Sequence, residues 1–75
     1  MAEIEDLPKN IIRSELQRRG LKVKDLVRLL KNYGEILTEN SFNNKMSRNS
    51  FSAVFFFKCM IALETKEIKL KDWVC

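Results

Sequence analysis

Residues that break helices are scarce in this chain, and their positions constrain its fold more than any other feature. Pro8, Gly20 and Gly34 are its only proline and glycines among 75 residues. Each glycine follows a stretch in which apolar residues recur every three or four positions, the period of an amphipathic helix. Glycine can also adopt the left-handed conformation that ends a helix. We therefore predict an all-α chain with short connections.

The first two helices are predicted at about residues 7–19 and 23–33. Each is closed by one of the two glycines, as expected for a helix C-terminus. Their apolar positions fall on one face of each helix. The residues expected on these buried faces are Leu7, Ile11, Ile12, Leu16, Val23, Leu26, Val27, Leu30 and Tyr33.

Two further helices are predicted at about residues 38–47 and 52–64, with a short helix or extended element at about 68–73. Thr38 can accept a hydrogen bond from the first turn of the third helix. Phe42 and Met46 are four residues apart and should both face inward. In the fourth helix the stripe expected to face the core consists of Ala53, Phe56, Phe57, Met60 and Leu63.

The fourth helix holds more apolar side chains than one buried face can accommodate. Val54, Phe55 and Ile61 would point away from the expected stripe. Two alternatives follow. Either the first helix and the segment around Trp73 cover these residues, or they form an exposed patch that binds a partner. A twofold homodimer is the simplest assembly that would bury such a patch.

Length and composition favour one small domain over residues 1–75 and argue against several functional classes. The chain has no His, two Cys that are far apart in sequence, and neither a glycine-rich phosphate loop nor a repeated carboxylate pattern. We therefore expect no enzymatic activity, no cofactor, no metal and no small-molecule substrate. The acidic start and the lack of a long apolar segment predict a cytoplasmic protein without a membrane association.

Charge and polarity point toward nucleic acid. The net charge is +4, and among residues 9–31 only Glu15 and Asp25 oppose the basic side chains. Such a cluster can neutralise phosphates, although it is also compatible with an ordinary solvated surface. With Phe42 inward, the outward face of helix 38–47 is formed by hydrogen-bonding side chains. These are Asn40, Asn43, Asn44 and Ser47, with Ser41 and Lys45 on the flanks.

The order of these elements resembles a known family over roughly residues 11–73. The matching stretches are LKVKDLV at 21–27, TENSF at 38–42 and the apolar helix from 52 to 63. They resemble the lambda-repressor-like helix-turn-helix domains, which include Cro and the XRE-type regulators. The stretches NNKMSR at 43–48 and FSAVFF at 51–56 are most similar to a group of small uncharacterised bacterial proteins with the same helix-turn-helix outline.

The resemblance implies a compact four- to five-helix domain that binds double-stranded DNA. Transferred residue by residue, it assigns base contacts to Asn40, Ser41, Asn43 and Asn44, and phosphate contacts to Lys22, Lys24, Lys45 and Arg48. The sequence departs from the family at two points. Val27 replaces a preferred alanine, and Gly34 comes about one helical turn later than usual. We therefore expect a recognition helix presented at a different angle.

Two functions are consistent with these features. The first is a transcriptional regulator that inserts helix 38–47 into the major groove of DNA. The second is a protein-interaction adaptor that keeps the helix-turn-helix scaffold but binds its partner through helix 52–64, because a fold does not determine a function. DNA binding should weaken with salt and with charge reversal at Lys24, Lys45 or Arg48, whereas an adaptor should be insensitive to both.

Overall fold

The computed structural model describes residues 4–68 and shows an all-helical chain over that range. Its α-helices are α1 (Leu7–Arg18), α2 (Val23–Leu30), α3 (Glu39–Arg48) and α4 (Ala53–Ala62). Two short 3₁₀ segments, η1 (Ile4–Asp6) and η2 (Lys31–Tyr33), precede α1 and follow α2. The all-α class is thus confirmed for the described residues. The element expected at about 68–73, with Trp73, lies outside them apart from Ile68.

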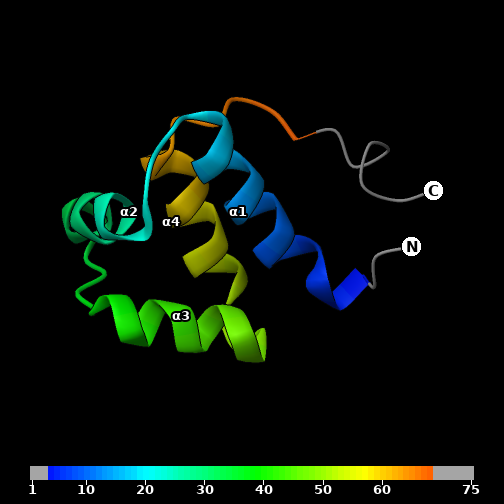
Figure 1. The fold of residues 1–75 in the computed structure, drawn as a ribbon, viewed down its shortest axis with the longest axis horizontal. Coiled ribbons are helices and arrows are strands. Elements are labelled where there is room, and N and C mark those ends of the chain that lie inside the picture. The colour runs from blue at the N-terminus through cyan, green and yellow to red at the C-terminus, as the bar shows by residue number, and fades with distance from the viewer. Residues whose placement is uncertain (1–3, 69–75) are drawn as a thin grey trace.

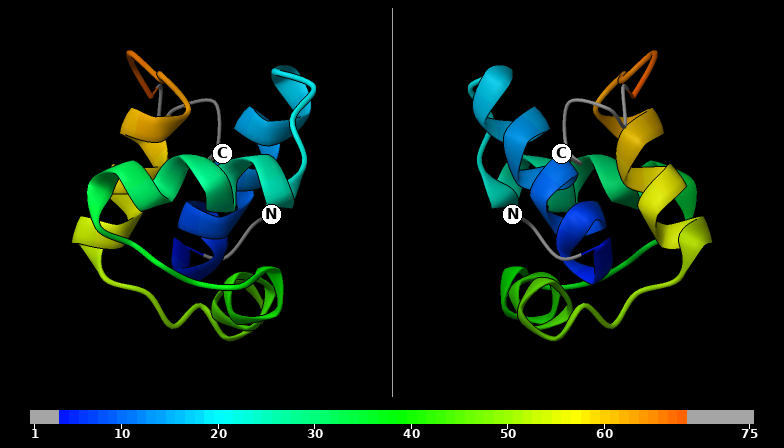
Figure 2. Two further views of the ribbon diagram at one scale, coloured as in Figure 1. Left: turned by 90° about the vertical axis from the view of Figure 1, so that its left-hand side faces the viewer. Right: turned by 90° about the vertical axis from the view of Figure 1, so that its right-hand side faces the viewer.

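The four α-helices are arranged as a group of three with α3 at one end. Figures 1 and 2 show α3 below α1, α2 and α4 in every view. Helix α4 contacts both α1 and α2, and α3 contacts α2. The most apolar helix of the chain therefore lies among the others, where the largest share of its surface can be buried.

Side-chain caps mark the starts of α3 and α4. The Thr38 hydroxyl accepts a hydrogen bond from the Ser41 backbone N–H, and the Ser52 hydroxyl accepts one from the Phe55 N–H, both at 3.1 Å. At α2 the roles are reversed, because the residue that precedes the helix is Lys22, whose side chain has no hydrogen-bond acceptor. The backbone N–H of Lys22 instead donates to Oδ2 of Asp25 at 2.9 Å. Each start thus satisfies one of the free donors of a first helical turn.

A residue with a positive φ follows each of α1, η2, α3 and α4 within two residues of its end. Gly20 and Gly34 do so as predicted, with φ of 67° and 84°. Asn49 and Glu64 adopt φ of 52° and 57°. After each of the four, the next backbone N–H donates to a carbonyl five residues earlier, which is the bond of a Schellman motif. The same Schellman hydrogen bond therefore follows all four helical segments.

The predicted second helix is divided in the structure. Residues 23–30 form α2, and residues 31–33 continue as the 3₁₀ segment η2 before Gly34. The tighter winding turns Tyr33 off the buried face, and its side chain is 40% exposed where burial was expected. The late position of Gly34 thus lengthens the connection to α3 and not the α-helix itself.

The buried core agrees with the sequence pattern in the first three helices. Leu7, Ile11, Ile12 and Leu16 of α1 are buried, as are Leu26, Val27 and Leu30 of α2. Phe42 and Met46 are the two buried residues of α3. In all three helices polar residues separate the apolar positions, so the buried face could be identified from spacing alone.

The orientation predicted for α4 is only partly correct. Met60 and Leu63 are buried and Val54 and Ile61 are exposed, as predicted. Phe55 was expected to point away from the core and is only 3% exposed, whereas Phe57 was expected inside and is 58% exposed. Ala53 is also exposed, and Phe56 is half-buried. The ring of Phe55 packs against Phe42 of α3 and against Phe51, with centroid distances of 6.3 and 5.7 Å. Because α4 lies over α3 as well as between α1 and α2, its inward face is rotated toward Phe55 and Cys59.

Candidate nucleic-acid interface

Helix α3 presents a polar face to the outside at one end of the molecule. Asn40, Ser41, Asn43 and Asn44 are all exposed, as is Ser47. Their exposure follows from the two buried residues, because Phe42 and Met46 fix which side of the helix faces the core. Neither α1, α2 nor α4 covers the lower side of α3 in Figures 1 and 2.

The three asparagine amides of this face have no hydrogen-bond partner within residues 4–68. Each amide offers a donor and an acceptor on one planar group, which suits the N6 and N7 edge of adenine. Ser41 differs, because its hydroxyl already accepts a hydrogen bond from Thr38 Oγ1 at 3.1 Å. Of the four predicted base-contact residues, the asparagines are therefore freer to bind a ligand than Ser41.

The four predicted phosphate contacts are not equivalent. Lys22 and Lys24 are exposed at the start of α2, and Arg48 is exposed in the last turn of α3. None of these three has an ion-pair partner in the described part of the chain. Lys45 is half-buried, and its Nζ lies 5.5 Å from the centroid of the Phe55 ring. That contact attracts the ammonium electrostatically and holds it close to the protein surface.

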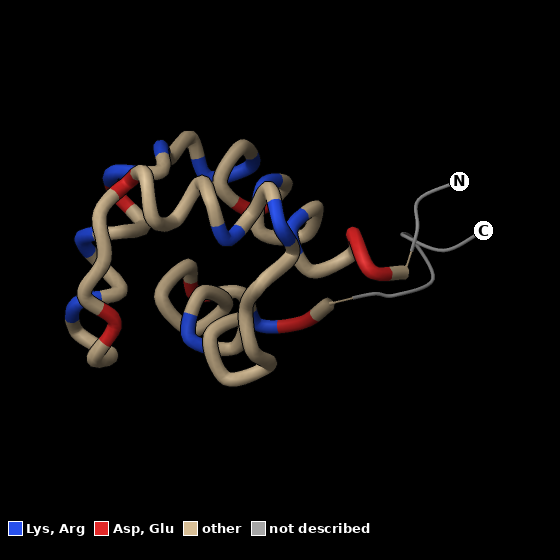
Figure 3. The backbone as a smooth tube through the Cα atoms, turned by 90° about the horizontal axis from the view of Figure 1, so that it is seen from below, with Lys and Arg blue, Asp and Glu red and all other residues tan. Residues whose placement is uncertain are grey.

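The first turn of α2 lies close to α3. Helix α2 packs on α3, and Figure 2 (left) shows the first turn of α2 above α3, which is seen end-on. The free cations of these two helices therefore belong to neighbouring segments at the same end of the molecule. Figure 3 shows the wider distribution of charge, with acidic residues beside basic ones in several places.

Much of the basic character predicted for residues 9–31 is neutralised within the chain. Arg18 binds Glu15 through two hydrogen bonds of 2.9 and 2.8 Å, and Arg19 lies 3.9 Å from the same carboxylate. These cations hold the pKa of Glu15 below its usual range, chiefly through the Arg18 hydrogen bonds. Lys9 pairs with Asp6 and Arg28 with Asp25. Spacings of three and four residues to an acid already indicated these pairs.

Within the basic cluster of residues 9–31, two exposed cations outside the predicted set remain available. Arg13 of α1 and Lys31 of η2 are exposed and have no partner within residues 4–68. The sequence analysis counted them in the basic cluster but assigned them no contact. Spacing would have singled out Arg13, because no acid lies three or four positions away from it, but not Lys31, which has Glu35 four positions later.

The segments before and after α3 are each anchored to another part of the chain. The Asn49 amide, directly after α3, donates to Oδ1 of Asp6 at 2.8 Å. This hydrogen bond is the main cause of the lowered pKa of Asp6, to which Lys9 also contributes. At the other end, the linker before α3 is joined to α4 by an ion pair of 3.1 Å between Glu35 and Lys58. The outward face of α3 is therefore presented on a helix fixed at two points.

The described residues show neither a metal site nor a membrane span. Within residues 4–68 no group of three or more Cys, Asp or Glu side chains could hold a metal ion. No helix in that range is long and apolar enough to cross a bilayer.

Comparison with known proteins identifies a family but no activity. No curated protein and no solved structure matches the chain. Residues 5–68 match the family described as "Domain of unknown function (DUF6471)". The matched range includes all four α-helices, η2 and all of η1 except its first residue. The chain therefore belongs to the DUF6471 family.

Proposed function

We propose that this protein is a DNA-binding transcriptional regulator of the lambda-repressor-like helix-turn-helix type. Helices α2 and α3 form the helix-turn-helix, and α3 enters the major groove. The observation that supports this most is the outward face of α3, where three unpartnered asparagine amides lie between free cations. Asparagine recognises adenine through two hydrogen bonds, and the cations bind the flanking phosphates.

In this proposal the two kinds of contact come from different parts of the interface. Asn40, Asn43 and Asn44 contact base edges, and Ser41 supports them through its link to Thr38. Lys22 and Lys24 bind phosphates from the start of α2. Arg48 binds the phosphate backbone at the far end of α3.

The long connection between α2 and α3 is compatible with this role. It consists of η2, Gly34 and four more residues, yet α3 still packs against α2. The connection alters the angle at which α3 is presented, and α3 remains at the free end of the molecule. The function needs neither a cofactor nor catalysis, and it would be performed in the cytoplasm, where bacterial DNA is found.

An amide-shift titration of the ¹⁵N-labelled protein with a random AT-rich duplex at two salt concentrations tests the proposal. We expect salt-dependent shifts concentrated in residues 40–48 and at Lys22 and Lys24. Unchanged spectra at low salt would refute DNA binding. Shifts confined to α4 on addition of another protein would instead support the adaptor, the second candidate, for which the exposed side chains of α4 are the evidence.

Base recognition needs a separate test with a matched control. A binding site is first selected from a random duplex library, and the double variant Asn43→Ala/Asn44→Ala is then compared with Gln17→Ala. Both changes remove exposed polar side chains, but Gln17 lies on α1. Loss of two bidentate contacts should weaken binding to the selected site by roughly 30-fold or more. Affinity for a random duplex should change little. Equal effects of the two variants would exclude base recognition by α3.

A further inference from the structure

The outer side of α4 carries an apolar face that no described residue covers. Val54, Phe57 and Ile61 are 62%, 58% and 57% exposed. They are separated by three and four positions, so they form one line along the helix. We call these three residues the α4 seam. Lys58, the only charged residue of α4, lies beside the seam and is held by Glu35 at 3.1 Å. The seam itself is therefore uncharged.

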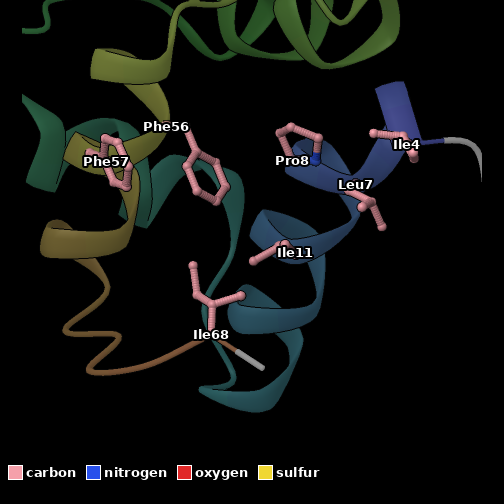
Figure 4. Close-up of a pocket in the computed structure, with 7 residues that line it drawn as sticks. All are labelled: Ile4, Leu7, Pro8, Ile11, Phe56, Phe57 and Ile68. Atoms are coloured by element: carbon pink, nitrogen blue, oxygen red, sulfur yellow. The ribbon is translucent and has the colours of Figure 1, made fainter. Parts of the chain in front are cut away.

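The seam continues into an apolar groove between α1 and α4. The groove has a volume of about 400 Å³. Figure 4 shows side chains from both helices directed toward it, with Phe57 at its edge and Phe56 closer to α1. Its lining is formed by Ile4, Leu7, Pro8, Ile11, Phe56, Phe57 and Ile68. Phe57 thus belongs to both surfaces and joins them into one apolar area.

The order of residues in the seam is self-complementary. Val54 and Ile61 are seven residues apart, which is about 10.5 Å along a helix, and Phe57 lies midway between them. In an antiparallel pair of α4 helices related by a twofold axis, Val54 faces Ile61 of the second copy, and the two Phe57 rings meet near the axis. A twofold interface requires this kind of reciprocal pairing.

From these observations we infer that two copies of the chain form a homodimer through the α4 seam, paired antiparallel. Each half-exposed seam residue leaves about 100 Å² of side chain accessible, so the seam supplies roughly 300 Å² per copy, to which the outer edge of the groove adds. A pair buries roughly 600 Å² through the seam alone, and it needs the groove edges of both copies to approach the roughly 1,000 Å² of a specific interface. The dimer should therefore be a weak one that forms only at high protein concentration.

The seam differs from the patch expected from sequence in one decisive residue. Phe57 replaces Phe55, which is buried against Phe42 and Phe51. A charge at Phe55 would disrupt the core, whereas a charge at Phe57 should affect only association. This difference allows the dimer to be tested with folded proteins.

Sedimentation equilibrium of the full chain without DNA, from about 1 μM to 1 mM, tests the inference. The mass should rise from 8.9 kDa toward twice that value. Phe57→Glu and Ile61→Glu should remain monomeric and keep their unfolding temperature. Ile36→Glu, at an 83% exposed position outside the seam, should dimerise normally. A wild-type mass of 8.9 kDa at 1 mM would overturn the inference. So would a large drop in unfolding temperature for both seam variants, because the chain itself would then cover the seam.

Disulfide trapping tests the antiparallel geometry. In a Cys75→Ser background, Phe57→Cys should form a disulfide-linked dimer on mild oxidation, because the two positions meet near the axis. Ile36→Cys should not. Cys59 does not interfere because it is fully buried. Equal cross-linking of both variants, or none of either, would overturn the antiparallel arrangement.

One consequence rests on the proposed function. If α3 binds DNA, antiparallel pairing places the two α3 helices at opposite ends of the dimer, because α4 begins next to α3 and runs away from it (Figure 1). Each copy should then bind a separate duplex, and the monomeric Phe57→Glu variant should bind a random duplex with wild-type affinity but should not join two duplexes. Self-association is measured without DNA, so a failure of the dimer and a failure of DNA binding give different results.

Discussion

The salt dependence of DNA affinity offers the sharpest quantitative test of the interface. Each phosphate neutralised by a Lys or Arg contributes about −0.9 to the slope of log affinity against log salt. The interface assigns four cations per copy, namely Lys22, Lys24, Lys45 and Arg48. The expected slope per bound copy is therefore about −3.6 if Lys45 reaches a phosphate and about −2.7 if it stays over the Phe55 ring. Between 50 and 200 mM salt, affinity should fall roughly 150-fold in the first case and roughly 40-fold in the second.

Single neutralisations should reduce that slope in an order set by the structure. Arg48→Gln removes an exposed cation without an ion-pair partner in residues 4–68, and should reduce the magnitude of the slope by about 0.9. The fall in affinity between 50 and 200 mM salt then becomes roughly 3.5-fold smaller. Lys45→Gln should change the slope less, because the Lys45 ammonium lies 5.5 Å from the Phe55 ring centroid and must leave it to reach a phosphate.

Arg18→Gln is the matched control. Arg18 is an exposed arginine, but two hydrogen bonds to Glu15 occupy its guanidinium. It also ends α1, at the opposite end of the molecule from α3 in Figure 1. Fluorescence anisotropy of a labelled random duplex over a salt series measures all slopes. Equal slopes for Arg18→Gln and Arg48→Gln would refute the assignment of phosphate contacts, and a slope near zero for the wild type would refute DNA binding.

Three further predictions concern stability and reactivity. Glu64→Gly should raise the free energy of unfolding by up to about 1 kcal/mol in urea denaturation, because Glu64 adopts a φ of 57° that favours glycine; a decrease would show that the Glu64 side chain stabilises the helix end. The lowered pKa of Glu15 contributes stability that is present above its unfolded pKa and is lost as pH falls through its folded pKa. Thermal unfolding of Glu15→Gln should therefore depend less on pH between 7 and 3 than that of the wild type, and an unchanged dependence would contradict this. Burial raises the pKa of Cys59 to about 12, so a Cys75→Ser variant should react with a thiol reagent at neutral pH only when unfolded; rapid reaction of the native protein would show that the core opens.

Local rules were sufficient to predict most of the helical organisation. The caps Thr38 and Ser52 and the terminal glycines act within one turn of their own position, so the sequence alone indicates them. Asn49 and Glu64 precede the same hydrogen bond, but asparagine indicates a left-handed conformation less strongly than glycine does, and glutamate does not indicate it at all. Their positions depend on where the helices pack, and spacing could not reveal them.

The orientation of α4 shows the limit of periodicity. In α3, polar residues surround Phe42 and Met46, so only one face could be buried. In α4, nine of its ten residues are apolar or small and only Lys58 is charged, so several orientations satisfy the same pattern. The contacts of Phe55 with Phe42 and Phe51 decide between them. These contacts join residues from three segments and are a property of the assembled fold.

The candidate interface was predictable in outline because it is the complement of a buried face. Once Phe42 and Met46 face inward, the exposure of Asn40, Asn43 and Asn44 follows from helix geometry. What each polar group already contacts could not be deduced in the same way. The hydrogen bond from Thr38 to Ser41 and the position of Lys45 over Phe55 are found only in the folded chain.

The packing of α3 also separates stability from binding in a way that can guide mutagenesis. Phe42 and Met46 are the only buried side chains of α3, and the Phe42 ring packs against Phe55 of α4. Substitutions among the exposed asparagines should therefore alter DNA affinity and leave the unfolding temperature nearly unchanged. A cavity at Phe55 would cost about 3–5 kcal/mol, and it would also release the contact that orients α3. Loss of binding in such a variant would follow from the loss of that orientation, even though Phe55 itself touches no DNA.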